Sequence, residues 1–511
     1  MKGNKIEKER RNEFSAADEL RMALKERALS CLLQGDVGAS SLRQLFINEY
    51  INYIGLIASN PHYSQKQASA LKNYDIGRLK STIRSIFSGY FSRRIHEKEQ
   101  SDVLILSRNR IVKVKTINGE ITGDYIFFSI IEDLKKNRPD IQFKLHQFDD
   151  LYFQYDHIRP ADLLKAAAFA LGKNIQWLIG RRAILSRIRA SGGGRAASCA
   201  EAFFSIRPLI RTALIAYNFE NMLTSIRPRL ILANDDCFYT KPAHHKEIMV
   251  LVLQSAGMVE TLEECRSLIF DDEALLPDYY LSSGTFFTDI KSRHHVAKKV
   301  VTTGLPRYDV LYDASEVYSR DAFFRIHRID PCRKMLLWAT QSHTLSPEEN
   351  SATVKAILRA SKEITDIILV IKQHPAEGEE CTRLLKEMIK EYQSDAIITP
   401  KDSDTYELLS ICDLHITRTS TTAREAVAMN KPVIIFNISG DDDGVEYAKE
   451  GVALGIYSSE KLKDAIINLL EDDSVLCKNR SRYIEKYLYR IDGKATERVV
   501  NLLAGLLSGE E

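Results

Sequence analysis

Short apolar runs, each bounded by polar residues, recur through the C-terminal half of the chain, and amphipathic stretches of helical length separate them. This alternation is typical of parallel βαβ units, whose strands are buried on both faces. It predicts a doubly wound sheet at about 330–475. The expected strands are 335–339, 367–372, 396–398, 414–416 and 432–436, and the expected helices are about 348–363, 379–392, 404–411 and 421–429.

The middle of the chain shows a looser form of the same pattern. The expected strands are 103–106, 143–147, 229–233, 249–253, 279–282 and 299–302, while 125–131 fits a strand or a helix equally well. We therefore expect a second Rossmann-like domain over 101–325, with a helical insertion near 158–200 that the run SGGGR interrupts. The fold class is α/β, with two doubly wound domains.

The two ends of the chain read as helical. Ser15 and Asp18 resemble a capping box, and Leu20, Ala23, Leu24 and Ala28 share one helical face. A second amphipathic run covers 42–57. Residues 1–100 are thus a helical extension or the first layer of the domain that follows. Residues 476–511 are expected to form helices that pack back across both domains.

Composition narrows the function. A net charge of +2 on 511 residues gives no general preference for nucleic acid, so an anionic ligand must be captured locally. The eight cysteines form no CxxC pair, which favours a reducing compartment and excludes a structural zinc site. The N-terminus lacks an apolar signal core, and no run reaches the ~18 apolar residues of a membrane span. We expect a cytoplasmic protein.

Candidate chemistry follows the expected strands, because open parallel sheets bind ligands beyond their carboxyl ends. After 414–416 come Ser420, Thr421 and Thr422 at a helix start, where hydroxyls and free amides suit a phosphate; an ordinary helix cap is the alternative. Glu425 in the first turn suits a ribose, or it complements the helix dipole.

Two more loops are expected at the same edge. Lys372 and His374 follow the strand 367–372, and either could neutralise a departing phosphate. Thr340 follows 335–339 in a loop without GxGxxG. Upstream, Gly304 fits a hinge between the domains and Arg307 is within reach of a phosphate, with a structural turn as the alternative.

The ordered set TGLPRYD, WATQS, KQHP and TSTTAREAVAMNKPVIIF resembles two related groups over about 225–470. One is the CDP-glycerol glycerophosphotransferase-like and capsule-polysaccharide transferases. The other is the UDP-N-acetylglucosamine 2-epimerases. The resemblance implies that the two doubly wound domains are of the GT-B type, with a helical N-terminal extension. The resemblance implies donor contacts at Gly304, Arg307, His374, Ser420, Thr421 and Glu425. It also implies that no metal is obligatory and no cofactor is used, the donor being a UDP-, CDP- or CMP-linked substrate.

The chain departs from this resemblance in places. Relatives carry Gln-His-Gly after the strand at 249–253, whereas this chain has Gln254 followed by Ser255. The missing histidine leaves its role vacant, or filled by His244 or His245. Epimerases have TDSGG at the phosphate loop, whereas this chain has TRTSTT. The loop 441–443 carries three aspartates, which are either solvated or order hydroxyl groups of a substrate.

The leading interpretation is a transferase that moves a sugar, or an alditol phosphate, from a nucleotide donor to a surface-glycan or lipid-linked acceptor. Asp235 or Asp236 would deprotonate the acceptor hydroxyl, with Glu260 in reserve; a helix cap is the alternative role for the aspartates. The second hypothesis is a UDP-N-acetylhexosamine 2-epimerase, and the third is a non-catalytic assembly protein.

One segment of the sequence suggests a peripheral membrane contact. Residues 163–190 combine an apolar helical face, Trp177 and a cluster of lysine and arginine residues, a pattern that suits an interfacial helix at the inner face of the plasma membrane. The alternative is a core-packing helix with a basic rim. The oligomeric state, the donor base and the acceptor are not encoded in any pattern of this sequence.

Overall fold

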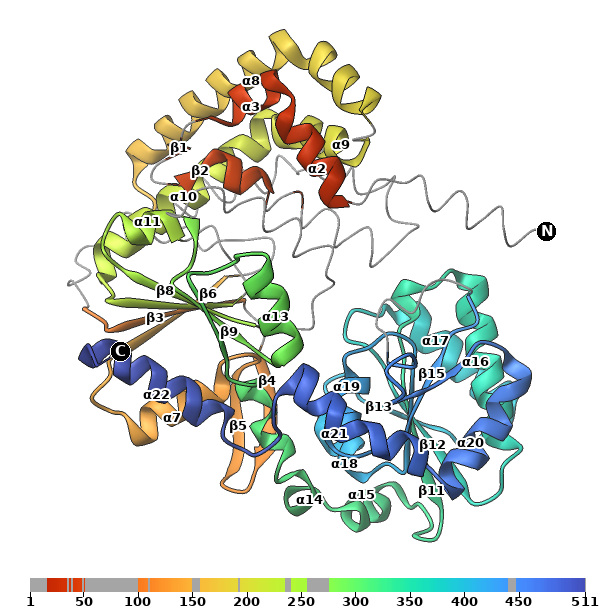
Figure 1. Ribbon diagram of the computed structural model, residues 1–511. Coiled ribbons are helices and arrows are strands. Elements are labelled where there is room, and N and C mark those ends of the chain that lie inside the picture. The colour runs from red at the N-terminus through yellow and green to blue at the C-terminus, as the bar shows by residue number, and fades with distance from the viewer. Residues whose placement is uncertain are drawn as a thin grey trace.

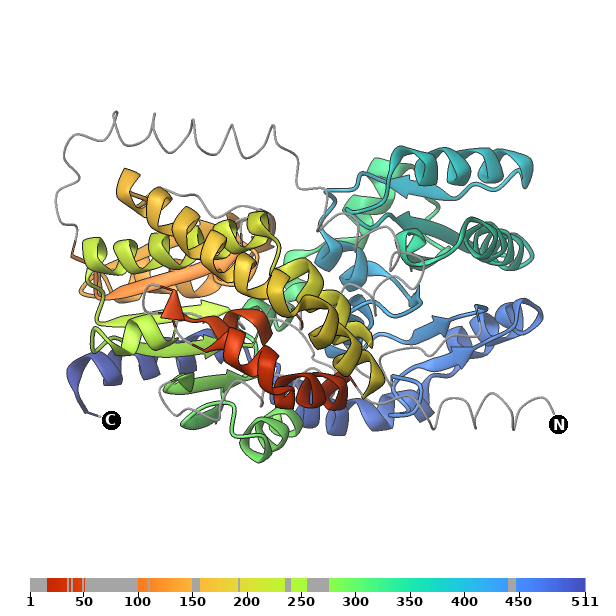
Figure 2. The ribbon, with the colours of Figure 1, turned by 90° about the horizontal axis from the view of Figure 1, so that it is seen from above.

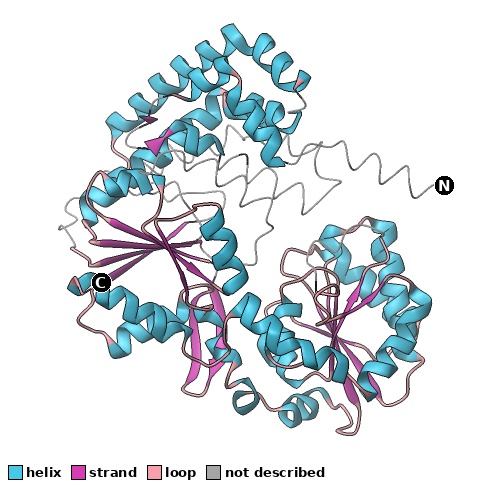
Figure 3. Cartoon of the chain, viewed as in Figure 1, coloured by secondary structure: helices cyan, strands magenta, loops and turns pink. Residues whose placement is uncertain are grey.

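Two six-stranded parallel sheets form the body of the protein (Figure 1). The computed structural model describes residues 16–34, 36–37, 40–47, 50, 100–108, 111–148, 157–191, 194–234, 240–254, 275–439 and 447–510. Helices flank both sheets, and a further helical layer covers the first one (Figure 3). The predicted pair of doubly wound α/β units is confirmed.

The first sheet has the strand order β10-β9-β8-β7-β3-β6, and all its pairs are parallel. Its strands are β3 (Val103–Arg108), β6 (Phe143–Phe148), β7 (Leu230–Asn234), β8 (Met249–Leu253), β9 (Tyr279–Ser282) and β10 (Lys299–Thr302). The chain winds from β3 to β6, then crosses back to β7 on the other side of β3. The carboxyl ends of β3 and β7 thus border the switch point of this sheet.

The second sheet has the order β13-β12-β11-β14-β15-β16, again with parallel pairs throughout. Its strands are β11 (Lys334–Ala339), β12 (Ile367–Lys372), β13 (Ile397–Thr399), β14 (Leu414–Thr417), β15 (Val433–Phe436) and β16 (Leu454–Ile456). In chain order this is 3-2-1-4-5-6, the order of dinucleotide-binding folds. Its switch point lies between β11 and β14.

Alternate residues of each buried strand serve different cores, because successive side chains of a strand point to opposite faces. In β3, Leu104 and Leu106 pack on the helical layer, whereas Val103 and Ile105 pack on the opposite side with α7 (Phe128–Asn137) and α22 (Ala495–Ser508). The second sheet divides likewise between two cores. The flanking helices are α16 (Pro347–Lys362), α17 (Glu379–Glu391), α18 (Thr405–Ile411), α19 (Thr422–Ala428) and α20 (Leu462–Glu471).

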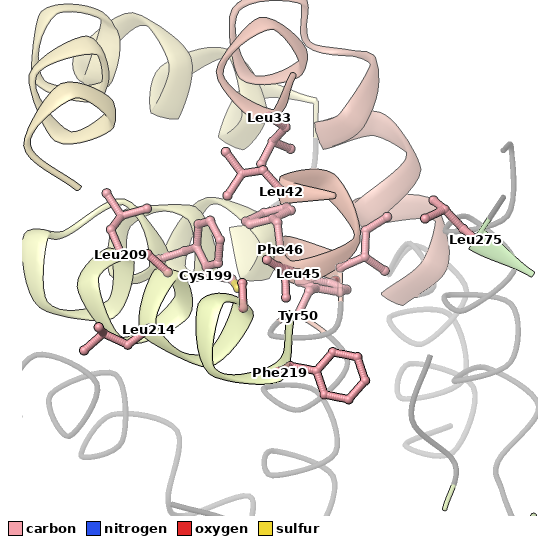
Figure 4. Packing of buried hydrophobic residues seen from close by; sticks show 14 of the residues in the cluster. Leu33, Leu42, Leu45, Phe46, Tyr50, Cys199, Leu209, Leu214, Phe219 and Leu275 are labelled. Atoms are coloured by element: carbon pink, nitrogen blue, oxygen red, sulfur yellow. The ribbon is translucent and has the colours of Figure 1, made fainter. Parts of the chain in front are cut away.

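A helical layer covers one face of the first sheet. Its helices are α2 (Ala16–Lys25), α3 (Arg27–Leu33), residues 42–47, α8 (Pro160–Ala190), α9 (Gly194–Phe203) and α10 (Ile206–Ile226). Phe46 is fully buried in a core that it shares with Leu209 and Phe219 of α10 (Figure 4). Of residues 1–100, the described part is thus mainly helical. Ser15 lies outside the described residues, as does most of the expected run at 42–57.

Several elements were not anticipated. The hairpin of β4 (Ile111–Thr116) and β5 (Gly119–Asp124) follows β3, and β1 (Asp36–Val37) pairs with β2 (Ser40–Ser41). The ambiguous stretch 125–131 leads into the helix α7. Short helices join the main elements: α11 (Thr240–His244), α13 (Thr285–Arg293), η3 (Pro306–Leu311), α14 (Ala314–Val317), α15 (Arg320–His327), η4 (Ser342–Thr344) and η5 (Ser459–Lys461).

The last two helices connect the domains. The helix α21 (Ser474–Leu488) contacts α19 of the second domain and α13 of the first, and α22 then packs on α7 of the first domain (Figure 2). Asp309 accepts hydrogen bonds from the N–H groups of Ala495 and Thr496, at 2.9 and 2.7 Å, and so caps α22. Ser283 Oγ donates to the carbonyl oxygen of Tyr487 at 2.9 Å.

Gly284 tests this crossing. A Cβ at this position would lie 2.5 Å from the carbonyl carbon of Tyr487 and 2.6 Å from the carbonyl oxygen of Lys486, both main-chain atoms of α21. We expect Gly284→Ala to lower the free energy of unfolding by about 1–3 kcal/mol, because the two helices must separate. Urea denaturation measures the change.

Gly172 in α8 is the matched control, since a Cβ there meets no atom within 4 Å. Gly172→Ala should instead stabilise the protein by up to about 1 kcal/mol, as a helix-interior Gly→Ala change does. Equal stabilities for wild type and Gly284→Ala would show that α21 does not approach α13 this closely.

Candidate functional site

Three loops meet at the carboxyl edge of the second sheet, at its switch point. They follow β11, β12 and β14, and direct hydrogen bonds join them. Gln341 of the first loop bonds Thr419 of the third, and the N–H of His374 in the second donates to Thr340 Oγ1 at 3.3 Å. The structure therefore brings together the loops that contain Thr340, His374 and Ser420.

Gln341 holds the loop after β14 in place. Its Oε1 accepts from the Thr419 N–H at 2.7 Å and from Thr417 Oγ1 at 3.3 Å, while its Nε2 donates to Thr419 Oγ1 at 3.0 Å. One amide side chain thus satisfies donors and an acceptor across the switch point. Gln341 was not among the residues predicted for the site, although it directly follows Thr340.

The segment 420–422 combines ligand-facing and structural roles. Ser420 Oγ accepts from the Thr422 N–H at 3.2 Å, which is a local turn and partly realises the capping alternative. All three side chains are half-buried. Among the described residues, no acceptor bonds the N–H groups of Ser420 and Thr421. The helix α19 has only seven residues, so its macrodipole is small. The amides and hydroxyls of this segment are therefore the groups that suit an anion.

Thr422 points its hydroxyl into the domain. His415 Nδ1 lies 3.2 Å from the carbonyl oxygen of Leu337 and its Nε2 lies 2.9 Å from Thr422 Oγ1. Burial lowers the pKa of His415 to about 4, so the ring is neutral near pH 7. The carbonyl requires the proton on Nδ1, and Thr422 therefore donates to Nε2. Thr422 fixes the start of α19.

His374 and Lys372 differ in orientation. The Nδ1 atom of the half-buried His374 accepts from the Ala376 N–H at 3.1 Å, so a neutral ring carries its proton on Nε2 as a donor. The Lys372 ammonium instead donates to the carbonyl oxygens of Gln373 and Lys401, at 3.2 and 2.5 Å. Burial lowers the pKa of Lys372. His374 is thus better placed for a ligand than Lys372.

Glu377 joins the loops after β11 and β12 by hydrogen bonds. Its buried carboxylate accepts from Thr340 Oγ1 at 2.8 Å, from the Ser342 N–H at 2.7 Å and from Gln373 Nε2 at 3.3 Å. The Thr340 hydroxyl is therefore engaged with Glu377. No local pattern pointed to this residue, because Thr340 and Ser342 precede it by 37 and 35 residues.

Arg418 brings a positive charge to the same edge. It donates to Asn437 Oδ1 at 3.1 Å, Ser439 Oγ at 2.9 Å and Thr344 Oγ1 at 3.3 Å, all neutral acceptors. These bonds tie the ends of β14 and β15 to the loop after β11. Arg418 was also missed from the sequence, where it stood inside the hydroxyl-rich segment. The triple aspartate at 441–443 lies outside the described residues.

Arg307 of η3 and Glu425 of α19 form a buried pair. They are 3% and 4% exposed, and Arg307 Nη1 lies 3.6 Å from Glu425 Oε1. Tyr308 donates to the same Oε1 at 3.3 Å, and burial raises its pKa well above the ordinary value, so the phenol stays protonated. Tyr125 and Tyr308 place their rings 4.6 and 4.5 Å from the guanidinium. A ribose contact by Glu425 would require this pair to open.

Gly304 lies apart from the three loops. Its φ of +79° is left-handed, and a Cβ there would meet Ala495 at 3.3 Å and Arg498 at 3.4 Å, both in α22. Its N–H also donates to the carbonyl oxygen of Ser282 at 3.2 Å, so its described contacts are with β9 and the C-terminal helices. A donor contact at Gly304 stays a prediction.

The candidates of the first domain are mostly outside the described residues. Asp235, Asp236, Ser255 and Glu260 belong to this group. Asn234 ends β7 at the switch point of the first sheet and is 7% exposed, and its Oδ1 accepts no hydrogen bond from the described residues. This places one buried polar atom at the edge where the aspartates follow.

His244 does not replace the missing histidine. Its Nε2 lies 3.0 Å from Asp278 Oδ2, and Asp278 also accepts from Lys298 at 2.8 Å and from the Val250 N–H at 2.8 Å. These bonds outweigh burial and lower the pKa of Asp278 to about 2. Asp278 precedes β9, so His244 and its neighbour His245 lie at the amino edge of the sheet, opposite the ligand edge.

Two features are absent from the described residues. No group of three or more His, Cys, Asp or Glu side chains is arranged to hold a metal ion there. No described helix is both long and apolar enough to cross a bilayer.

A family model supports the resemblance read from the sequence. Residues 252–505 match the family model described as CDP-Glycerol:Poly(glycerophosphate) glycerophosphotransferase. No curated protein sequence matches the chain. Among solved structures, the UDP-GlcNAc 2-epimerase from Neisseria meningitidis bound to UDP-GlcNAc is 15% identical, with a TM-score of 0.49, covering 79% of this chain and 99% of its own. The wall teichoic acid polymerase TagF is 12% identical, with a TM-score of 0.47, covering 86% and 99%.

The bracing by Gln341 predicts a local effect of its removal. We expect Gln341→Ala to raise amide hydrogen exchange across 417–421 by about tenfold, because the loop loses about 1.4 kcal/mol of local stability. Thr419→Val is the control, since it removes one hydroxyl and keeps the N–H bond to Gln341. It should raise exchange less. Unchanged exchange in Gln341→Ala would contradict the bracing role.

The buried pair predicts a global effect. Arg307→Met should lower the free energy of unfolding by about 3–5 kcal/mol, because it leaves a buried carboxylate without its cation. Adding Glu425→Gln should recover part of this loss, so the double variant is more stable than the two single losses summed. The exposed pair Lys113–Glu120, at 3.9 Å, is the control; Lys113→Met should cost about 0–1 kcal/mol. Strict additivity at Arg307 and Glu425 would refute the pairing.

Proposed function

We infer that this chain, which matches the glycerophosphotransferase family model over residues 252–505, transfers a group from a nucleotide-activated donor to a hydroxyl of a surface-glycan or lipid-linked acceptor. The observation that carries this inference is the convergence of three loops at the switch point of the second sheet. Those loops present amides, hydroxyls and an imidazole donor to one place. Such a set suits the diphosphate of a nucleotide donor.

The donor end is the better supported half of the site. The amides of Ser420 and Thr421, which bond no acceptor among the described residues, would bind non-bridging phosphate oxygens together with the two hydroxyls. His374 Nε2 would donate to the phosphate that leaves, and Arg418 adds a fixed positive charge nearby. Thr340, Gln341 and Thr422 hold these groups in place. Preorganised donors of this kind stabilise charge that develops on the leaving group.

Glu425 has a positioning role in this scheme. Its carboxylate is tied to Arg307 and Tyr308, so it fixes α19 and thereby the loop that starts it. Lys372 likewise ties the loop after β12 to Lys401 rather than to the ligand edge.

The family match favours an alditol phosphate over a sugar as the transferred group. In that reaction the acceptor oxygen forms a bond to the distal phosphorus of a CDP-alditol, the phosphoanhydride bond breaks and CMP departs. The proton of the acceptor hydroxyl passes to a base. Sugar transfer would instead form a bond at the anomeric carbon and release the nucleoside diphosphate. Both reactions place the charge of the leaving group at the same three loops.

The base is proposed to come from the first domain. Asp235 and Asp236 follow Asn234 at the carboxyl end of β7, at the switch point of that sheet, which supports either as the acceptor base. Glu260 remains in reserve. We also propose that donor binding needs no divalent cation, because neutral and cationic protein donors are available for the diphosphate.

The test is a donor panel with the purified full chain. CDP-glycerol and UDP-N-acetylglucosamine are offered with EDTA, and with or without a hydroxyl-bearing glycerophosphate oligomer as acceptor. We expect CMP release from CDP-glycerol that requires the acceptor. His374→Ala should lower kcat/KM by about 10²–10³-fold, as loss of a leaving-group donor does.

His245→Ala is the matched control, because His245 is an exposed histidine at the amino edge of the first sheet. It should behave as the wild type. Formation of an epimer from UDP-N-acetylglucosamine alone would replace the transferase by the isomerase. Full activity of His374→Ala would remove the donor site proposed here.

A further inference from the structure

The outward face of α8 is apolar where a surface helix is normally polar. Of the twelve large hydrophobic residues that are exposed in the described parts of the chain, five lie on this one helix. They are Leu164 (75% exposed), Leu171 (53%), Ile175 (49%), Leu178 (57%) and Ile179 (84%). Their spacings of seven, four, three and one residues place them on one stripe.

The inward face of α8 is already satisfied. Ala166, Ala170, Trp177, Ile184 and Ile188 are buried against the rest of the helical layer. The Trp177 ring stacks on Phe204 with centroids 5.0 Å apart, and Asn174 Nδ2 donates to the Phe204 carbonyl oxygen at 2.8 Å. The helix is therefore held without any of the five outward residues.

Beyond its first turn, which contains Asp162, the charge of α8 is of one sign. From residue 163 to its end at Ala190 the helix has no Asp or Glu, and it carries six cations: Lys165, Lys173, Arg181, Arg182, Arg187 and Arg189. Glu201 pairs with Arg181 and Arg189 from α9, and Glu26 pairs with Arg187. Arg182 and Arg189 continue the line of the apolar stripe and are exposed.

The position of α8 leaves this stripe accessible. It forms the outer edge of the helical layer, on the side away from both sheets (Figure 1). The five residues span 164–179, which is about 23 Å of helix at 1.5 Å per residue. A continuous apolar stripe with basic residues and no carboxylate matches a surface that offers acyl chains and negative headgroups together.

We propose that α8 lies in the interface of an anionic lipid bilayer, with Leu164, Leu171, Ile175, Leu178 and Ile179 inserted and the arginines at headgroup level. The helix lies along the surface and does not cross it. This inference goes beyond the proposed function and does not rest on it, because the stripe is remote from the three loops of the second sheet. It specifies a lipid surface as the partner of the helical layer.

Vesicle co-sedimentation of the full chain tests the proposal. We expect binding to phosphatidylcholine vesicles that contain phosphatidylglycerol, weaker binding at high salt, and little binding to phosphatidylcholine alone. The variant Leu171→Gln/Ile175→Gln/Ile179→Gln should lose about tenfold or more in partitioning. Glutamine has a high helix propensity, so the melting temperature of this triple variant should match that of the wild type.

The matched control changes exposed isoleucines elsewhere. Ile111→Gln/Ile117→Gln on the β4–β5 hairpin removes residues of similar exposure, 61% and 62%, and should leave vesicle binding unchanged. Arg182→Gln/Arg189→Gln should weaken binding to anionic vesicles alone. Donor binding should be the same in all variants, which separates this test from that of the proposed function.

Two results would overturn the proposal. One is wild-type binding to anionic vesicles that equals the binding of the triple glutamine variant, including the case in which neither binds. The other is a concentration-dependent dimer, seen by light scattering, that the triple variant abolishes. In that case a second copy of the chain, and not a bilayer, covers the stripe.

Discussion

Burial of the Arg307 guanidinium is the constraint on which the junction of the two domains depends. A buried cation is costly unless hydrogen bonds and an opposite charge compensate it. Here Tyr125 contributes from the first domain, Tyr308 from the connecting segment and Glu425 from α19 of the second. The three parts of the chain cannot separate without exposing or orphaning a charge, so their relative position is fixed by electrostatics as well as by packing.

This junction also sets the site. Glu425 is in the first turn of α19, and the same helix begins with the segment 420–422 that faces the ligand edge. Because the contacts of Glu425 hold the first turn of α19, they also hold the segment at which the helix begins. Gln341 holds the preceding loop from the other side of the switch point. The donor loops are thus held between a buried ion pair and a neutral amide. The residue before Glu425, Arg424, is also buried, and its Nε and Nη1 bond no acceptor within the described residues.

The sequence predicted the sheets well because parallel strands buried on both faces are nearly continuous apolar runs. The strand 367–372 was predicted residue for residue, because five consecutive apolar residues and a final lysine fit a short buried strand. The three-residue β16 gave too short a signal. The β4–β5 hairpin was missed although Asn118-Gly119 between alternating runs is a hairpin signal. The stretch 125–131 was ambiguous because a short apolar run fits either period.

The site was predicted less well, for a different physical reason. Residue type and position after a strand identified which loops converge, but not what each side chain bonds. Gln341 reaches Thr419 across 78 residues and Tyr308 reaches Glu425 across 117, and no local pattern contains such pairs. Arg307 and Glu425 each looked like a ligand group when considered singly, whereas together they neutralise one another.

The helical layer shows the limit of amphipathicity as a guide. The helix α8 has apolar residues on both its covered and its outward face, so its polar and apolar positions do not segregate into two sides along the whole length. The periodicity of apolar residues does not distinguish a helix buried in the protein core from a helix whose outward face contacts a lipid surface. Burial separates the two cases, because only the inward residues find protein partners.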